Sequence, residues 1–475
     1  MDSGVCERPT TVAPTTPTAS RSLNSGSNQF QVYSKTYPKS CSKFSSLVFQ
    51  SKLDSPAALA FNYLHPLKML NPNSHRQERI IFQAGFVFFL VAASIGALLR
   101  IFPYFLSPKL NYSYFLHAHS HVAFLAWVFN AFFAIALGLF VREVERPAYF
   151  RLFLVAQVAN VGMLIAFPLQ GYAAWSIAFT TLHLLCSVLL IRKIWRSPFT
   201  TDAARPYLLA SILFMLASNL GPLALGPLAA LEMRDSPWYT LSIYFYMHFQ
   251  YNGWFLFFLL AACLQVLPKN SLLIDKASKA FPWLLCGAIF TLFQSALWAS
   301  SSLWINGLSL LGSSSQIYAC IILFRCHQEI NTLISRLNSR HSRKIARIVL
   351  LLFIAKIGMQ FTASLPGLVH FAIDRYAAIG YMHLVFLGIV TPTLFAWAIE
   401  RRWLSQAPSL KPALILYALG VALTEVVLVY TPIATYSAWR QLPHREPLLA
   451  IAAFTILISL SAMLPCLFRP KASNG

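Results

Sequence analysis

Three histidines at alternating positions open one of the apolar stretches of the chain. His117, His119 and His121 lie in the segment Leu116–Gly138, LHAHSHVAFLAWVFNAFFAIALG. On a helix, His117 and His121 share a face, whereas His119 lies roughly 200° further round, on the other side. Neutral imidazole is a common ligand of iron and copper, so this helix can supply one metal site with a pair of ligands, or two sites.

Four further histidines lie within apolar stretches: His183, His248, His370 and His383. In the membrane topology described below, the helices of His248 and His383 enter from the same side as the HAHSH helix, and the helix of His370 leaves there. These three and the HAHSH histidines then lie at similar depth in the outer half of the membrane, whereas His183 lies deeper. Hydrogen bonding within the bundle satisfies a single buried histidine. For six at one depth, we predict that at least two bind haem or another metal from facing helices.

The elements that must position these residues are long apolar helices. Of the 475 residues, 57% are hydrophobic and 11% are charged, a balance that excludes a soluble globular protein. Twelve apolar runs have about the 20 residues that a bilayer requires. They lie near 80–102, 115–141, 150–170, 173–193, 206–231, 238–267, 281–300, 303–326, 345–372, 377–400, 411–433 and 446–468.

We therefore predict an all-α, polytopic integral membrane protein with about twelve transmembrane helices in one bundle, over residues 80–468. The breaks at 170–171 and 300–302 are the shortest, so each of these two pairs of runs is either two helices or one bent element.

The formal net charge of +22 follows the pattern of a membrane protein rather than that of a nucleic-acid surface. Lys and Arg gather in the loops that are cytoplasmic if the N-terminus is inside, such as 325–347, whereas the opposite loops carry few. This bias predicts that both termini are cytoplasmic, with a bacterial inner membrane as the expected compartment. The lipid bilayer is then the partner of the basic loops, and no nucleic-acid partner is expected.

The eight cysteines form no CxxC pair, and most lie inside apolar runs. We therefore expect neither a disulfide framework nor a zinc knuckle. Because the CxxCH motif of covalent haem attachment is absent as well, any haem is expected to be non-covalent, of the b- or o-type, or to be supplied with a partner.

The first part of the chain, residues 1–79, is rich in Ser, Thr and Pro and has no apolar stretch of the kind found in a signal peptide. We expect it to be a disordered cytoplasmic segment. The alternative is that translation starts near Met69 and that the residues before it are an artefact of the gene model. Residues 469–475 are expected to form a short cytoplasmic tail.

Two charged residues lie well inside predicted helices, Lys356 in the ninth and Glu425 in the eleventh. Each is costly in a membrane without a partner or a hydrated cavity. They either pair with each other or belong to a path for protons.

Two motifs resemble those of a known family. HAHSHVAFLAW, in which an H-x-H pair is followed by small and aromatic residues, resembles the haem-ligand helix of the haem-copper oxidase superfamily, particularly C-type oxidases and nitric oxide reductases. YFYMHFQYNGWF, in which His248 precedes Asn252, Gly253 and Trp254, resembles the helix that gives this family its first copper or non-haem iron ligand. Twelve helices with both termini inside are similar to subunit I of those enzymes, and to membrane haem proteins of the NnrS type.

The resemblance implies that one of His117, His119 and His121 binds a low-spin haem from one side and that His383 binds it from the other. It also implies His370 as a further candidate haem ligand and His248 as a ligand of a second metal, copper or non-haem iron. The sequence departs from the family in the seventh helix, which lacks a histidine pair, and in the tenth, which has one histidine rather than two. A divergent member with an incomplete binuclear centre is therefore implied, unless His370 and the other histidines of the second helix complete it.

The leading hypothesis from the sequence is a haem-binding membrane protein of respiratory electron transfer or nitric oxide handling. As an enzyme it would be an oxidoreductase of the cytochrome oxidase or nitric oxide reductase type, and its partners would be an electron donor or additional oxidase subunits. One alternative is a twelve-helix proton-coupled transporter that uses the histidines, Lys356 and Glu425 as a proton relay. The other is a haem or metal sensor without turnover.

Overall fold

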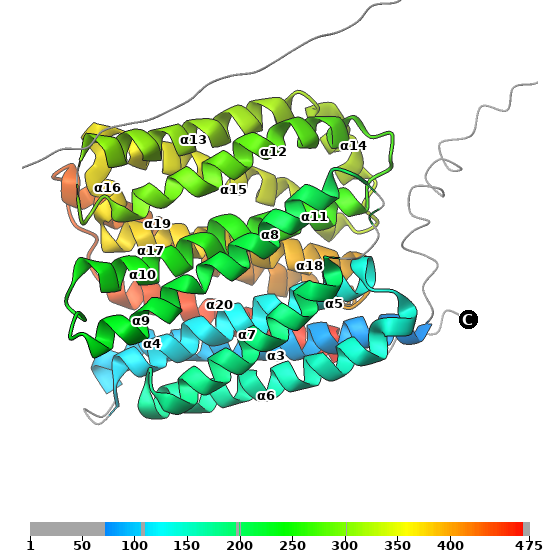
Figure 1. The fold of residues 1–475 in the computed structure, drawn as a ribbon, viewed down its shortest axis with the longest axis horizontal. Coiled ribbons are helices and arrows are strands. Elements are labelled where there is room, and N and C mark those ends of the chain that lie inside the picture. Colours follow the sequence, from blue (N-terminus) through cyan, green and yellow to red (C-terminus); the bar gives the residue numbers. More distant parts are fainter. Residues whose placement is uncertain (1–71, 106–109, 196–198, 200, 301, 469–475) are drawn as a thin grey trace, which may run out of the picture. The chain divides into compact units, whose positions relative to one another are not determined.

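The computed structural model describes residues 72–105, 110–195, 199, 201–300 and 302–468 as a bundle of helices (Figure 1). These ranges contain no strand, and eleven of their helical stretches are long and apolar enough to cross a membrane. The prediction of an all-α, polytopic membrane protein is therefore confirmed. The Ser/Thr/Pro-rich segment up to residue 71, with Met69, and the tail at 469–475 lie outside the described residues.

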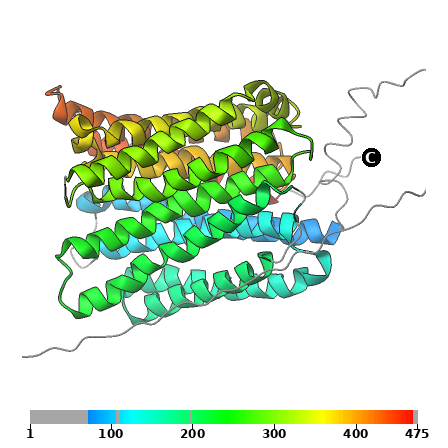
Figure 2. The same ribbon diagram turned by 45° about the horizontal axis from the view of Figure 1, so that its top comes forward.

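Each crossing is one long helix or two helices joined through a short π-helical segment or bend. The elements in chain order are α3 (Pro72–Phe105), α4 (Tyr112–His121), α5 (Phe129–Phe140), α6 (Arg146–Gln170), α7 (Ala174–Ile194), α8 (Ala204–Ser218), α9 (Leu220–Ala230), α10 (Pro237–His248), α11 (Leu256–Gln265), α12 (Leu272–Phe290), α13 (Leu303–Phe324), α14 (His327–Ser335), α15 (Arg340–Ser364), α16 (Val369–Ile373), α17 (Arg375–His383), α18 (Thr391–Glu400), α19 (Leu410–Tyr436) and α20 (Arg445–Phe468). The long helices run side by side along one direction in both views (Figure 1 and Figure 2).

The short break at 170–171 separates two distinct helices, α6 and α7. Gly171 has a φ of +65°, a left-handed conformation that glycine adopts without strain, and the chain turns there. An added Cβ at Gly171 would lie 2.3 Å from Cε1 of Tyr114, so the turn also has no room for a side chain. Both facts explain why glycine stands at this position.

The seventh expected crossing corresponds to α12, which is not among the eleven stretches with the length and apolarity of a membrane span. It has 19 residues and carries three charges in its first turns: Asp275, Lys276 and Lys279. It packs along α13, and a 3-10 segment, Thr291–Ala296, continues it. The order of helices is as expected, and the eleven others have the length and apolarity of a membrane span.

The first crossing begins earlier than hydropathy indicates, at Pro72 rather than at residue 80, so the boundary expected at 79 is wrong. The physical reason is a buried ion-pair cluster. Glu78 is fully buried, and its carboxylate oxygens lie 3.2 Å from Arg146 of α6 and 2.8 Å from Arg401 at the end of α18. Because the two arginines compensate its charge, Glu78 can lie inside the packed bundle, and the helix that carries it begins before the apolar run.

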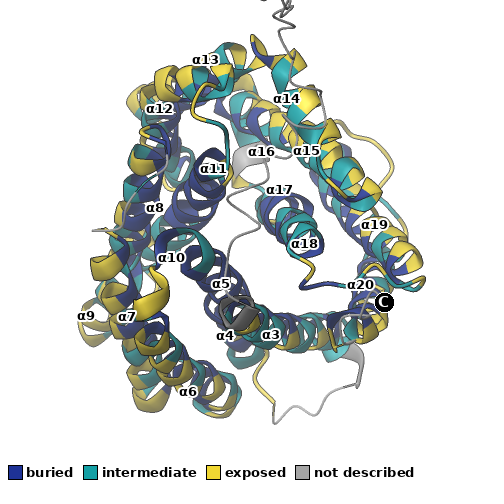
Figure 3. Cartoon of the chain, turned by 90° about the vertical axis from the view of Figure 1, so that its right-hand side faces the viewer, coloured by how far each residue is buried: buried dark blue, intermediate teal, exposed yellow. Residues whose placement is uncertain are grey.

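Three crossings form the interior of the bundle. In α4–α5, α10–α11 and α17–α18, 89%, 83% and 67% of the most apolar stretch is buried, compared with 44% or less in the other spans. Figure 3 looks along the helices and shows these three mostly in dark blue, with yellow outward faces on the helices around them. The interior crossings are the second, sixth and tenth, which carry the HAHSH histidines, His248 and His383.

Each interior crossing contains a π-helical segment of seven residues that begins directly after a histidine. The segments are Val122–Val128 after His121, Phe249–Phe255 after His248, and Leu384–Val390 after His383. π-Helical turns are uncommon in proteins, and those that occur are frequently found at functional sites. The same feature recurs in every fourth crossing, which is a structural repeat that the amino-acid sequence does not reveal.

Candidate functional site

The three histidines of α4 point to two sides of that helix. The rings of His117 and His121 both lie against α6, with centroids 6.1 and 4.3 Å from the ring of Phe167. His119 faces α3, where its Nδ1 lies 2.9 Å from the carbonyl oxygen of Ala92. The predicted division of these histidines between two faces is therefore confirmed.

His119 and His383 are brought together from the second and tenth crossings. They lie within electrostatic range of each other and of Arg100. The Nδ1 of His119 lies 2.9 Å from the carbonyl oxygen of Ala92, and that of His383 lies 2.8 Å from the carbonyl oxygen of Ile379. A carbonyl that accepts a hydrogen bond from Nδ1–H selects the tautomer whose Nε2 has a free lone pair. Both rings thus present an Nε2 that can coordinate a metal.

The helix α3 provides space and charge beside this pair. An added Cβ at Gly96 would lie 2.9 Å from Cε1 of His119, so the imidazole occupies the space that a larger residue would fill. One turn further along, the side chain of Arg100 is 23% exposed and lies 3.8 Å from the carboxylate of Glu446 on α20. A guanidinium near both imidazoles is suited to the carboxylates of a haem.

Aromatic side chains pack between α3, the second crossing and the tenth crossing. The ring of Trp127 stacks on Phe89 at a centroid distance of 5.0 Å, and Phe89 lies 6.3 Å from Phe386. The indole nitrogen of Trp127 donates a hydrogen bond to the hydroxyl of Thr391 at 3.2 Å. This packing holds α3 and the second and tenth crossings at a set distance, and therefore also positions the helices that carry His119 and His383.

His248 links its own crossing to α12. Its Nε2 lies 2.8 Å from the carbonyl oxygen of Ala288, and its Nδ1 lies 3.4 Å from the amide nitrogen of Asn252. Asn252 in turn accepts a hydrogen bond from the hydroxyl of Tyr381. In the described part of the chain, no group of three or more His, Cys, Asp or Glu side chains is arranged to hold a metal ion. His248 is thus placed as a connection between crossings.

The two other membrane histidines make different contacts. His183 of α7 has its Nε2 3.0 Å from the carbonyl oxygen of Leu125 and lies within electrostatic range of His121. The ring of His370 in α16 lies 4.4 Å from the ring of Tyr436, at the end of α19. The structure thus places His183 on the His121 side of the second crossing.

Lys356 and Glu425 face different neighbours. Lys356 donates a hydrogen bond to the amide oxygen of Gln316 at 3.1 Å and lies within electrostatic range of His248. Glu425 lies beside α17, where an added Cβ at Gly380 would be 3.8 Å from its Oε2, and its Oε1 is buried without a hydrogen bond. No ion pair within 4 Å joins these two described residues, which removes the alternative that they pair with each other.

Three contributors to the His119–His383 site were not candidates from the sequence: the carbonyl of Ala92, Gly96 and Arg100. A backbone carbonyl and a glycine carry no chemical signature in a sequence. The one available signal is their spacing, because residues four apart lie on one face of a helix. Which helix that face meets cannot be deduced from the spacing.

The comparison with models of known protein families finds no match to this chain, and the comparison with curated proteins finds no significant match. Its function must therefore be inferred from the residues of the site and their geometry.

Proposed function

We propose that this protein binds one non-covalent haem, of the b- or o-type, between His119 and His383, and that it acts in electron transfer in respiration or nitric oxide handling. The observation that carries the proposal is the common environment of the two rings. They come from different interior crossings, each has its Nδ1 at a backbone carbonyl, and both lie near Arg100. Bis-histidine ligation of haem uses one imidazole from each of two facing helices, and this pair comes from two interior crossings.

The surrounding residues have distinct tasks in this proposal. The carbonyls of Ala92 and Ile379 orient the imidazoles, so that little freedom is lost when Nε2 binds iron. Arg100 pairs with a haem carboxylate. The packed aromatic rings exclude water and set the helix separation. The haem, when bound, supplies one-electron transfer.

The proposal narrows two sets of metal ligands that were assigned from the sequence. Among the HAHSH histidines the proposal selects His119, because His117 and His121 face α6. His248 is not included as a ligand of a second metal, because its Nε2 is engaged with the carbonyl of Ala288. The resemblance to the haem-copper oxidase superfamily supports the haem and an electron-donor partner. It supports no complete binuclear centre.

The optical spectrum of the purified protein, oxidised and reduced, tests the proposal. After expression with adequate haem supply, we expect a Soret band and the sharp bands of a six-coordinate low-spin haem. His119→Ala and His383→Ala should each remove those bands. His117→Ala, on the same helix but on its other face, is the matched control and should retain them. The absence of a Soret band in the parent, or low-spin bands in both His119→Ala and His383→Ala, would refute the proposal.

A proton-coupled transporter is the second candidate, favoured by the buried and unpartnered Oε1 of Glu425. In that case, haem-free protein in proteoliposomes should take up protons, and Glu425→Gln should abolish the uptake. Proton uptake is also measured with the haem-loaded protein. This separates the two candidates, because a transporter of this kind does not need haem to take up protons.

A further inference from the structure

Two adjoining hollows lie on the side of the second crossing that carries His121, away from His119. Both are narrow and partly open to the surface. They share Ser187, Met215 and Trp254 as lining residues, so they adjoin between α7, α8 and the sixth crossing, and together they are called the cleft below. Nothing in the proposed haem site uses this cleft.

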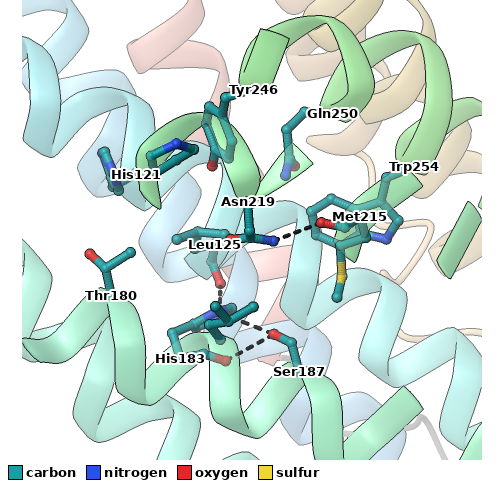
Figure 4. Close-up of a pocket in the computed structure, with 12 residues that line it drawn as sticks. His121, Leu125, Thr180, His183, Ser187, Met215, Asn219, Tyr246, Gln250 and Trp254 are labelled. Carbon is teal, nitrogen blue, oxygen red and sulfur yellow. Dashed lines mark hydrogen bonds between the residues drawn. The ribbon is translucent and has the colours of Figure 1, made fainter. Parts of the chain in front are cut away.

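The first hollow contains most of the polar side chains that line the cleft. Figure 4 shows Tyr246 and Gln250 pointing into it beside Asn219, with His121 on one side. Gln250 is 1% exposed, and its amide nitrogen donates to the hydroxyl of Ser218 at 2.8 Å, but its Oε1 is buried without a hydrogen-bond partner. The Nδ1 of His121 lies 2.9 Å from the carbonyl oxygen of His117, which leaves Nε2 free. No Asp, Glu, Lys or Arg is among the described residues that line this hollow.

The second hollow is apolar and continues along α7. Its walls are aromatic and aliphatic, with Phe132, Phe133, Leu190 and Ile194 among them. The first hollow reaches Thr180 and the second reaches Ile194, so the cleft follows about 20 Å of α7 at the helical rise of 1.5 Å per residue. A polar head compartment thus leads into an apolar slot of the length of a hydrocarbon tail.

The cleft lies at the lipid-facing periphery. The main contacts of α7 are with α6, and its outward side chains are exposed, Leu185 by 56% and Leu189 by 52%. A molecule dissolved in the bilayer therefore reaches the cleft without crossing the bundle.

We propose that this cleft binds one uncharged amphiphile from the membrane, with a hydroxyl-bearing head in the polar hollow and a hydrocarbon tail in the apolar slot. The head is uncharged because the described lining residues include no Asp, Glu, Lys or Arg that would compensate a charge. It carries a hydroxyl because the buried Oε1 of Gln250 is an acceptor that needs a donor. The Nε2 of His121 accepts a hydrogen bond from a second hydroxyl group, directly or through a water molecule. Hydroquinones and diacylglycerols both have this chemistry.

Native mass spectrometry of the protein in phosphatidylcholine nanodiscs tests the proposal, with decylubiquinol, dioctanoylglycerol and decyl phosphate as probes. We expect one bound molecule of at least one uncharged probe and no specific binding of decyl phosphate. Ser187→Phe fills the junction of the two hollows and should abolish binding. Leu185→Phe, on the same helix but facing lipid, is the matched control and should bind as the parent does. Gln250→Leu should weaken binding about tenfold, through the loss of one buried hydrogen bond.

Each outcome has a defined meaning. Binding of decylubiquinol alone identifies a membrane quinol as the source, and binding of dioctanoylglycerol alone identifies a neutral lipid. The proposal is overturned if neither binds, if decyl phosphate binds equally, or if Ser187→Phe binds like Leu185→Phe. Should Ser187→Phe not fold, an unchanged affinity of Gln250→Leu overturns it. His119→Ala, which removes the proposed haem, should leave this binding intact, so the two proposals can fail separately.

Discussion

Substitution of Glu78 by Gln is expected to loosen the end of the bundle opposite the histidines. The carboxylate of Glu78 lies between Arg146, at 3.2 Å, and Arg401, at 2.8 Å. The Glu78 side chain is fully buried, and those of the two arginines are 3% and 6% exposed. One carboxylate therefore holds three crossings together through two buried guanidinium groups.

The loss in the free energy of unfolding follows from these contacts. A hydrogen bond to a charged group contributes about 1.5–3 kcal/mol. Removing one partner of a buried ion pair typically costs about 3–5 kcal/mol, because the remaining charge is left uncompensated. Two arginines are left in this case, so we expect Glu78→Gln to cost at least about 3 kcal/mol. Gln has nearly the same shape as Glu, so the effect measures charge rather than packing.

Unfolding in mixed micelles with increasing dodecyl sulfate, followed by tryptophan fluorescence, measures this loss. The matched control is Glu145→Gln, which removes the carboxylate of an exposed pair with Arg142 at 3.2 Å, where the side chains are 68% and 32% exposed. An exposed pair of this kind contributes little to stability, because solvent screens it. Equal effects of Glu78→Gln and Glu145→Gln would show that the buried cluster does not hold the crossings together.

Three further changes test the site. Gly96→Val places methyl groups against His119 and should weaken haem retention about tenfold, measured as transfer of haem to apomyoglobin; unchanged transfer would contradict the close packing. Tyr381→Phe removes the donor to Asn252 and should lower the free energy of unfolding by about 1–2 kcal/mol at unchanged haem content. His248→Ala breaks the link between α10 and α12 and should cost about 1–3 kcal/mol without altering the copper content, whereas loss of bound copper would show that His248 is a metal ligand after all.

The order of the crossings could be predicted because a bilayer imposes a common length on apolar helices. The start of the first helix could not, because hydropathy penalises Glu78 wherever it stands. Its partners, Arg146 and Arg401, lie far away in the sequence, and only the fold shows that all three charges are buried together. The π-helical segments were equally inaccessible, because the histidine that precedes each of them does not by itself predict a π-helical turn.

The candidate ligands were predicted as a set, and the structure sorts them by neighbour. His248 meets a carbonyl of α12, His370 meets Tyr436, and His119 meets α3 near His383. These neighbours depend on which helices pack together, and hydropathy carries no information on that packing. Sequence alone therefore left open which histidine of HAHSH is the ligand.

Depth along an interior helix can be predicted, but direction around it cannot. The helix α4 leads into a π-helical segment that is buried on every side, so no polar face indicates where His119 or His121 points. The helical rise places the two residues within about 3 Å of one level in the membrane. Packing then directs His119 towards α3 and His121 towards α6 and the cleft beside α7. One helix thus separates a pair of imidazoles suited to haem from a cleft suited to an amphiphile, and substituting either histidine should affect only the function on its own side.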